Sequence, residues 1–542
     1  MHRNLAALAL LTLAACTPPA PSTGPSPRPG PADTVRIGAG RIERLVYQPV
    51  SPALPPIPAA DGALALRVTH PTQGQARPRV DSTFIYGSVG TGQAALEING
   101  TAIPVAPNGA FIAYLPMPQD GTWRLRAQRG GEEVTHTVSY ATPSTGGGGS
   151  STPSTNAVYA TPRLGTVTGG GDTLASGSDA IYARPTPTGT YRWFFPRGAR
   201  LAVAERRGDQ YRVRLDAQTD AWVDAANLSL AETTSAPPAP GAVNSTIAQV
   251  PDGVDLRLRA GGRPFLVETS DAGVVVSVYG ATGGTMSGTP PANTWFRTIS
   301  QAAVAGGTQW VLNLAGGAWG YKAWYEANGD LVVRVRRPPA IDPANPLRGR
   351  RIVIDPGHPP AGATGPTGLY EGDANLAIAL PLAEKLRAAG AEVILTRTGR
   401  EGLVSSTNSG EELRARVQLA VSRNAEILIS VHNNAFGEGA DPFRAHGTSV
   451  YYFHPFAQAL ARELDREIVG VTRIPDIGAR QQNLALARPT WLVAVLTESL
   501  FMPIPEQEAA LRNPAFLERL ADAHVRGLEA FLRARAAAGG AR

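Results

Sequence analysis

The stretch RIVIDPGHPP, residues 351–360, decides the fold of the C-terminal third of the chain. RIVI predicts a buried strand, and DPG predicts a turn that leaves His358 at the carboxyl end of that strand. Further strand patterns follow as EVILTR, EILISV, SVYYF and LVAVLTE, and helical patterns occupy residues 374–389, 411–423, 456–469 and 514–537. This alternation predicts an α/β domain over residues 347–537, with a mixed, mostly parallel sheet flanked by helices.

Four side chains of this domain stand where functional groups of such sheets usually lie. His358 follows the first strand, and His432 ends the strand EILIS. Glu498 ends the strand LVAVLT, and Glu371 opens the helix EGDANL. Two neutral imidazoles and a carboxylate are the ligand set of a catalytic zinc site that keeps its fourth position for water. Each residue alone has an ordinary alternative, such as a hydrogen-bonded structural histidine or a glutamate that stabilises a helix N-terminus.

The segments DPGH, YEGDANL, SVHNNA and TES occur in this order and resemble the zinc-dependent N-acetylmuramoyl-L-alanine amidases of the type 3 family. The resemblance implies that His358, Glu371 and His432 bind Zn²⁺. It also implies that Glu498 is the catalytic residue, which takes a proton from water and passes it to the departing amine. The implied reaction is cleavage of the amide bond between N-acetylmuramic acid and L-alanine of the peptidoglycan stem peptide by zinc-activated water.

Other polar side chains of the domain are weaker candidates. Possible substrate-binding groups are Asn433, Asn434, Arg480 and Arg488. The amides could donate hydrogen bonds to the peptide, and the guanidinium groups could meet substrate carboxylates. A structural alternative for Glu498 is an ion pair with one of these arginines. His446 and His454 lie near the strand SVYYF, and we expect both to be bystanders because three ligands are already assigned.

Two features depart from the family pattern. Pro359 and Pro360 stand where glycines usually follow DPGH, and a leucine and a phenylalanine follow TES where the family tends to have a glycine. These changes stiffen or crowd the rim, so we expect altered substrate preference rather than lost activity. The interval FGEGADPFRAH is too short for the blocking helix that regulated relatives place there. The domain from Leu347 onward is therefore expected to be open without an activator.

Three small all-β modules are predicted upstream, because short strand patterns alternate with turn signals. They resemble an immunoglobulin-like sandwich at residues 61–142, a Src-homology-3-like barrel at 157–232 and an AMIN-like domain at 245–340. A Gly/Ser linker at 143–156 and a Pro/Ala linker at 233–244 separate them. Nothing in the first module suggests chemistry, so we expect it to be a spacer.

Aromatic residues of the second and third modules have two possible roles. In the barrel they could form a peptide groove or the core: Tyr182, Tyr191, Trp193, Phe194, Tyr211 and Trp222. In the AMIN-like module they could bind glycan or fill the sandwich: Trp295, Trp310, Trp319 and Trp324.

The N-terminus resembles the signal of a bacterial lipoprotein. Residues 1–16 contain Arg3, followed by an apolar stretch that is too short to span a bilayer, and they end in the lipobox-like sequence LAAC. A lipid on Cys16 would anchor an exported protein in the cell envelope, on the periplasmic side or the outer surface of a membrane. Residues 17–60 are rich in proline and predict an extended tether.

Composition limits the partners. The 542 residues carry a formal net charge of +6 without a long basic block, so no nucleic-acid partner is expected. Peptidoglycan is the partner implied by the resemblance. Two alternatives stay open, namely a zinc peptidase acting within stem peptides and a wall-binding lipoprotein with an inactive amidase domain.

Overall fold

The structure is a computed structural model, and it describes residues 40–141, 156–169, 180–232, 235–404, 406 and 408–538. The chain divides into two units, Met1–Arg41 and Ile42–Arg542, and every helix and strand described below belongs to the second. Cys16, the rest of the predicted signal and most of the Gly/Ser linker lie outside the described residues. Among the described helices, none is long and apolar enough to cross a bilayer.

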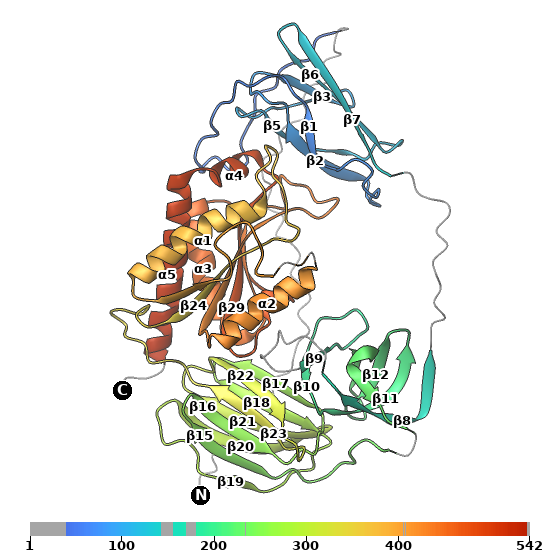
Figure 1. Cartoon of the computed structure of the whole chain (residues 1–542), viewed down its shortest axis with the longest axis vertical. Helices are drawn as coiled ribbons and strands as arrows, with labels where there is room; N and C mark the ends of the chain where they lie inside the picture. Colours follow the sequence, from blue (N-terminus) through green and yellow to red (C-terminus); the bar gives the residue numbers. More distant parts are fainter. Residues whose placement is uncertain are drawn as a thin grey trace, which may run out of the picture. The chain divides into compact units, whose positions relative to one another are not determined.

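The C-terminal domain is built on one six-stranded sheet, shown in the gold-to-red part of Figure 1. Its strands, in spatial order, are β25 (Glu392–Leu395), β24 (Arg351–Pro356), β26 (Ile427–Asn434), β29 (Val493–Phe501), β27 (Thr448–Tyr452) and β28 (Asp476–Gln481). Only the β27–β29 pair is antiparallel. The sheet is therefore mixed and mostly parallel, as the sequence predicts, although the pattern did not indicate β28.

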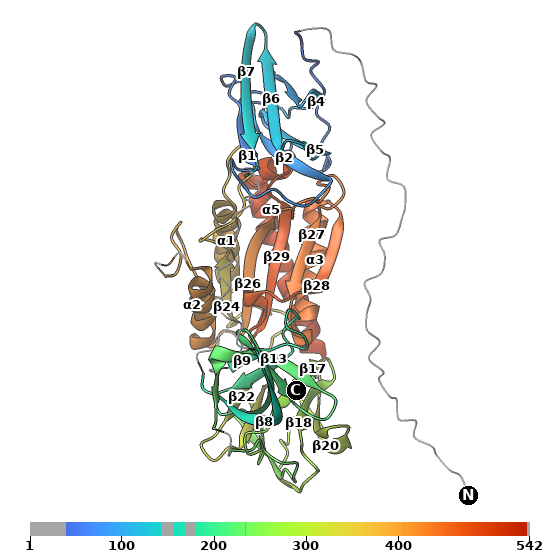
Figure 2. The ribbon, with the colours of Figure 1, turned by 90° about the vertical axis from the view of Figure 1, so that its right-hand side faces the viewer.

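Helices cover both faces of this sheet. They are α1 (Glu371–Ala388), α2 (Ser409–Ser422), α3 (Gln458–Thr472), α4 (Pro505–Ala510) and α5 (Pro514–Ala538). The helices α1, α3 and α5 share a hydrophobic core with alternate residues of the central strands, such as Ile427 and Ile429. The intervening residue Leu428 packs on the other face with Val417 of α2. Successive side chains of a strand point to opposite faces of the sheet. Because helices cover both faces, most positions of the central strands are buried, which explains why these strands are hydrophobic along most of their length. Figure 2 gives the second view of these layers.

The upstream modules are all-β, and each combines two sheets. The first contains β1 (Arg67–His70), β2 (Ser82–Ser88), β3 (Ala95–Ile98), β4 (Thr101–Ile103), β5 (Ala110–Pro116), β6 (Thr122–Arg129) and β7 (Glu132–Ser139). The second contains β8 (Ala157–Val167), β9 (Ala180–Ala183), β10 (Trp193–Pro196), β11 (Arg200–Arg207), β12 (Gln210–Arg214), β13 (Asp220–Asp224) and β14 (Leu228–Leu230). The third contains β15 (Ser245–Val250), β16 (Gly253–Leu258), β17 (Phe265–Ser270), β18 (Gly273–Tyr279), β19 (Met286–Gly288), β20 (Phe296–Val304), β21 (Gly307–Leu314), β22 (Gly320–Tyr325) and β23 (Leu331–Arg336).

The aromatic residues of the second module divide between a buried core and a surface covered by the C-terminal domain. Three of them are buried: Trp193, Tyr211 and Trp222. The rings of Tyr182 and Tyr191 stack with centroids 4.4 Å apart, and the Arg488 guanidinium lies over both at 5.0 and 5.1 Å. The face considered as a peptide groove is therefore occupied by another part of this chain.

Tryptophans of the third module also fill cores. Trp295, Trp310 and Trp319 are buried, whereas Trp324 is partly exposed beneath Arg334. Trp319 belongs to the hydrophobic core of the C-terminal domain, together with Tyr321. Its indole Nε1 donates to the Glu426 carbonyl at 2.8 Å. Three of the four tryptophans thus have the packing role that the sequence left open.

Residues 40–60, the described part of the Pro-rich segment, differ from the tether that their composition predicts. Ile42 is buried, and Leu54 joins the core of the C-terminal domain. The Ser51 amide donates to Glu506 Oε1 at 2.8 Å, and the Tyr47 hydroxyl donates to the other oxygen of that carboxylate. Two polar residues among the prolines, Tyr47 and Ser51, thus share a partner more than 450 residues away, which local composition cannot reveal.

Candidate metal centre

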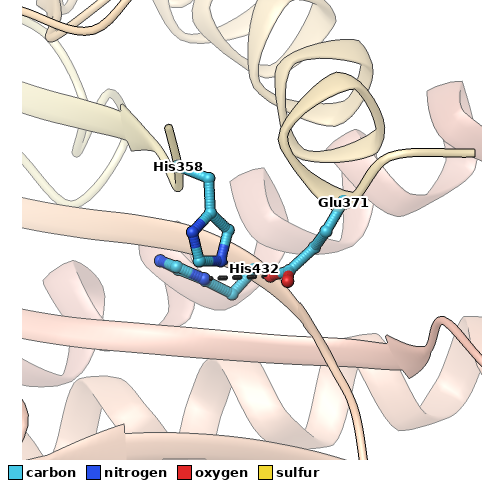
Figure 3. Close-up of side chains that lie close together, drawn as sticks. All are labelled: His358, Glu371 and His432. Carbon is cyan, nitrogen blue, oxygen red and sulfur yellow. Dashed lines mark hydrogen bonds and ion pairs between the residues drawn. The ribbon is translucent and has the colours of Figure 1, made fainter. Parts of the chain in front are cut away.

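A turn, a strand end and a helix start bring three ligand-type side chains together at the carboxyl edge of the sheet (Figure 3). His358 follows β24 in a backbone conformation with φ of 61°, His432 lies on β26, and Glu371 begins α1. His358 Nε2 lies 3.0 Å from Glu371 Oε1, and His432 Nδ1 lies 3.1 Å from the same oxygen. The three ligand atoms all lie within 4.8 Å of one another.

The dimensions of this cluster fit a zinc ion. Zinc binds imidazole nitrogen and carboxylate oxygen at about 2.0–2.2 Å, so tetrahedral ligand atoms lie roughly 3.3 Å apart. The observed nitrogen-to-oxygen distances of 3.0 and 3.1 Å are close to that spacing. Gly357 is required for this approach, because a Cβ there would overlap the His432 ring. The glycine of DPGH thus makes room for the second imidazole.

The surroundings of Glu371 keep its carboxylate in the charged form that a metal ligand needs. It is 5% exposed, and the Ala363 amide donates to its Oε2 at 3.0 Å. Burial alone would raise the pKa of Glu371, but its hydrogen bonds with His358 and His432 outweigh burial and lower that pKa well below the usual range. The group is therefore an anion at neutral pH.

Glu498 lies beside the cluster on the next strand. It pairs in register with His432 across β26 and β29, so the two side chains share one face of the sheet. Within the described part of the chain, its Oε2 is shielded from solvent and has no hydrogen-bond partner. Burial and the nearby Glu371 carboxylate raise the pKa of Glu498 well above the ordinary value. A carboxyl group of this kind is suited to hold and release a proton.

A network that sequence analysis did not identify fixes the His358 turn. Arg416 of α2 is 2% exposed and pairs with the buried Asp355 carboxylate at 3.0 Å. Its Nη2 also donates to the carbonyls of His358 at 2.9 Å and Pro359 at 3.0 Å. Because these bonds hold the main chain around the ligand, Arg416 positions His358. The only signal in the sequence was the second arginine of LRARVQLA, in the helix before the SVHNNA strand.

The weaker candidates are not brought together at the metal centre. Asn433 is buried, and its amide nitrogen donates to Asn375 Oδ1 at 2.9 Å. Asn375 in turn donates to the Gly357 carbonyl, so this pair supports the turn rather than the open face. The Asn434 Oδ1 accepts from the amide of the following residue, Ala435. The structure does not place Arg488 near the cluster: it precedes β29, at the opposite end of the strand from Glu498.

The two histidines expected to be bystanders also lie outside the cluster. His454 is buried, stacks on Phe456 and contacts the Arg488 carbonyl at 2.7 Å through Nε2. Burial lowers its pKa to about 4. His446 is buried too, with Nδ1 3.0 Å from the Pro442 carbonyl. Among the described residues, the potential metal cluster contains only the two other histidines and Glu371.

Comparison with known proteins identifies the class to which this fold and site belong. The family described as N-acetylmuramoyl-L-alanine amidase matches residues 352–530. The probable cell wall amidase LytH of Staphylococcus aureus is 30% identical over 219 residues, which are 40% of this chain and 68% of LytH. This chain therefore belongs to the N-acetylmuramoyl-L-alanine amidase family.

Solved structures give similar matches. An N-acetylmuramoyl-L-alanine amidase from Clostridium difficile 630 is 29% identical, with a TM-score of 0.31, over 34% of this chain and 97% of that one. The catalytic domain of CwlV, an amidase from Bacillus (Paenibacillus) polymyxa var. colistinus, is 30% identical, with a TM-score of 0.30, over 34% of this chain and 98% of that one.

Proposed function

We propose that this chain hydrolyses peptidoglycan with a Zn²⁺ ion held by His358, Glu371 and His432. Its family establishes the amidase reaction, cleavage of the bond between N-acetylmuramic acid and L-alanine. The observation that carries the zinc proposal is the approach of two imidazole nitrogens to one carboxylate oxygen at 3.0 and 3.1 Å. Zn²⁺ in such a site polarises a carbonyl and lowers the pKa of water toward about 7.

Glu498 would move the proton of this reaction. Its carboxylate accepts a proton from the attacking water, and the resulting carboxylic acid donates that proton to the alanine nitrogen as the C–N bond breaks. The products are a free lactyl carboxylate on the glycan and a stem peptide with an L-alanine amino terminus. The burial of this carboxyl group supports the role, because burial favours the protonated form that the second step needs.

Arg480 is the substrate-binding candidate that the sheet geometry supports best. Ser449 of β27 pairs with Glu498, and Tyr451 pairs with Arg480. Ser449 and Tyr451 are two residues apart, so their side chains lie on one face. The exposed Arg480 is therefore on the face that carries Glu498, where it would bind a stem-peptide carboxylate.

Product analysis tests this function. Purified peptidoglycan digested by the full chain is expected to release new L-alanine amino termini and no other new amino termini. A zinc peptidase would instead free residues inside the stem peptide, and an inactive wall-binding protein would free none. In the same assay, Arg480→Ala is expected to raise KM about tenfold, because a charge-assisted hydrogen bond is lost. An unchanged KM would remove Arg480 from the substrate site.

A lipid anchor on Cys16 would place this activity in the cell envelope. The sequence supports it through the apolar stretch that ends in LAAC. Acyl chains on this cysteine would bury methylene groups in a membrane at about 0.8 kcal/mol each. Cys16→Ser is therefore expected to move the protein from the membrane fraction to the soluble fraction, with unchanged specific activity. If the variant stays with the membrane, another segment holds it there.

A further inference from the structure

The loops that follow the two metal-site histidines both contact the N-terminal β-sandwich, which is defined here as residues 61–141. The first loop, residues 359–370, separates His358 from α1. Arg67 Nη2 of the sandwich donates to the Pro366 carbonyl at 2.8 Å. The Tyr86 hydroxyl donates to the Thr364 carbonyl at 3.1 Å. The sandwich therefore holds the main chain of this loop directly.

The second loop, residues 435–447, follows His432 and β26, and it contains no helix. Three side chains of the sandwich contact the Glu438 carboxylate of this loop. Gln75 Nε2 donates to Oε1 at 2.7 Å, and Thr83 Oγ1 donates to Oε2 at 3.0 Å. His70 Nε2 lies 3.2 Å from Oε1. The loop is thus tied to the sandwich at its tip.

An aromatic contact connects the same surface to the strand of Glu498. Phe84 of β2 is 2% exposed and lies edge-on to Phe436 of the second loop, with centroids 5.6 Å apart. Phe436 stacks on Phe501 at 4.7 Å. Phe501 is the last residue of β29, three positions after Glu498. A continuous row of rings therefore runs from the sandwich to the strand that carries the proposed proton-transfer group.

The sandwich does not seal the metal site. With the sandwich in contact, the His358 and His432 side chains remain 22% and 15% exposed. A blocking element would bury the imidazoles, whereas this one contacts the loops beside them. The contacts therefore fit a support for the site rather than a plug.

We propose that the β-sandwich is a built-in activator, which fixes the loops at 359–370 and 435–447 in the positions that productive peptidoglycan binding requires. This inference rests on the proposed metal site, because it takes the loops after His358 and His432 to be the rim of the substrate cleft. It replaces two expectations from the sequence, that the first module is only a spacer and that the domain from Leu347 onward needs no activator. Preorganised loops avoid the ordering cost that flexible loops incur when a substrate binds.

The test is Glu438→Ala in the full-length protein. Glu438 lies in an exposed loop outside the proposed metal site, and its side chain is 31% exposed, so the protein should fold without it. The matched control is Glu133→Ala, which removes an exposed carboxylate from β7 of the sandwich. A second variant, Gln75→Ala with Thr83→Val, removes two partners of Glu438 from the other side. Each protein is assayed on purified peptidoglycan, with metal content by elemental analysis and loop protection by hydrogen exchange.

We expect Glu438→Ala and the double variant to lower kcat/KM about tenfold with wild-type metal content, and to exchange faster in residues 359–370 and 435–447. Glu133→Ala should match the wild type in every measurement. Faster exchange with unchanged kcat/KM would return the sandwich to the role of a spacer, and a rise in kcat/KM would identify it as a cover. If the proposed metal site itself were wrong, the wild type would show no metal-dependent activity in the same assay.

Discussion

Glu498→Gln is expected to lower kcat on purified peptidoglycan by about 10²- to 10⁴-fold while the metal stays bound. The amide has nearly the shape of the carboxyl group but cannot accept a proton from water. Since Glu498 is absent from the ligand cluster, its loss should not reduce metal affinity. The measurement is the initial rate of L-alanine amino-terminus release, together with elemental analysis of the purified variant.

The control for this experiment is Glu392→Gln. Glu392 is an exposed glutamate on the edge strand β25, in an ion pair with Arg351. It should retain wild-type kcat, because it lies at the start of its strand, away from the carboxyl edge of the sheet. A Glu498→Gln enzyme with more than a third of wild-type kcat would show that another group transfers the proton.

His432→Ala is expected to abolish both metal binding and activity. Removal of one imidazole leaves two ligands, and the Glu371 carboxylate loses one of its two histidine partners. An under-satisfied buried charge costs about 1–3 kcal/mol or more, so the melting temperature should also fall by several degrees. Wild type dialysed against a chelator should lose activity and regain it with added Zn²⁺, whereas the variant should not recover.

His136→Ala is the matched control for the histidine variant. His136 is exposed on β7, and the substitution should leave metal content, melting temperature and rate unchanged. Full activity of chelator-treated wild type, with less than a tenth of an equivalent of metal remaining, would contradict the metal mechanism and leave only the family assignment.

The parts of the site that sequence analysis predicted are those with short-range signals. Each ligand candidate lies within two residues of a strand end or helix start, so the local pattern also gives its place in the sheet. The order of strands along the chain and the rule for functional groups at carboxyl edges then bring His358 and His432 to one side. The mixed sheet was predictable for the same reason.

The contacts that sequence analysis missed join residues far apart in the chain. Arg416 and Asp355 are separated by 61 positions, and Glu438 meets Gln75 across 363. Neither pair produces a periodic pattern in the sequence. A single polar residue on a helix or loop is indistinguishable from an ordinary surface residue until its partner is known. Arg488 illustrates the opposite error: its charge suggested a substrate anion, but two tyrosine rings cover it.

The burial of Trp319 and Tyr321 in the C-terminal core determines how this enzyme can be divided. A truncated protein that begins at Leu347, where the α/β pattern begins, would lack both side chains. Phe531 would then lose the indole ring of Trp319, whose centroid lies 5.5 Å away. Loss of one large buried aromatic typically costs about 3–5 kcal/mol, a large share of the stability of an ordinary domain. A truncated enzyme should therefore retain the third β module, which precedes the C-terminal domain.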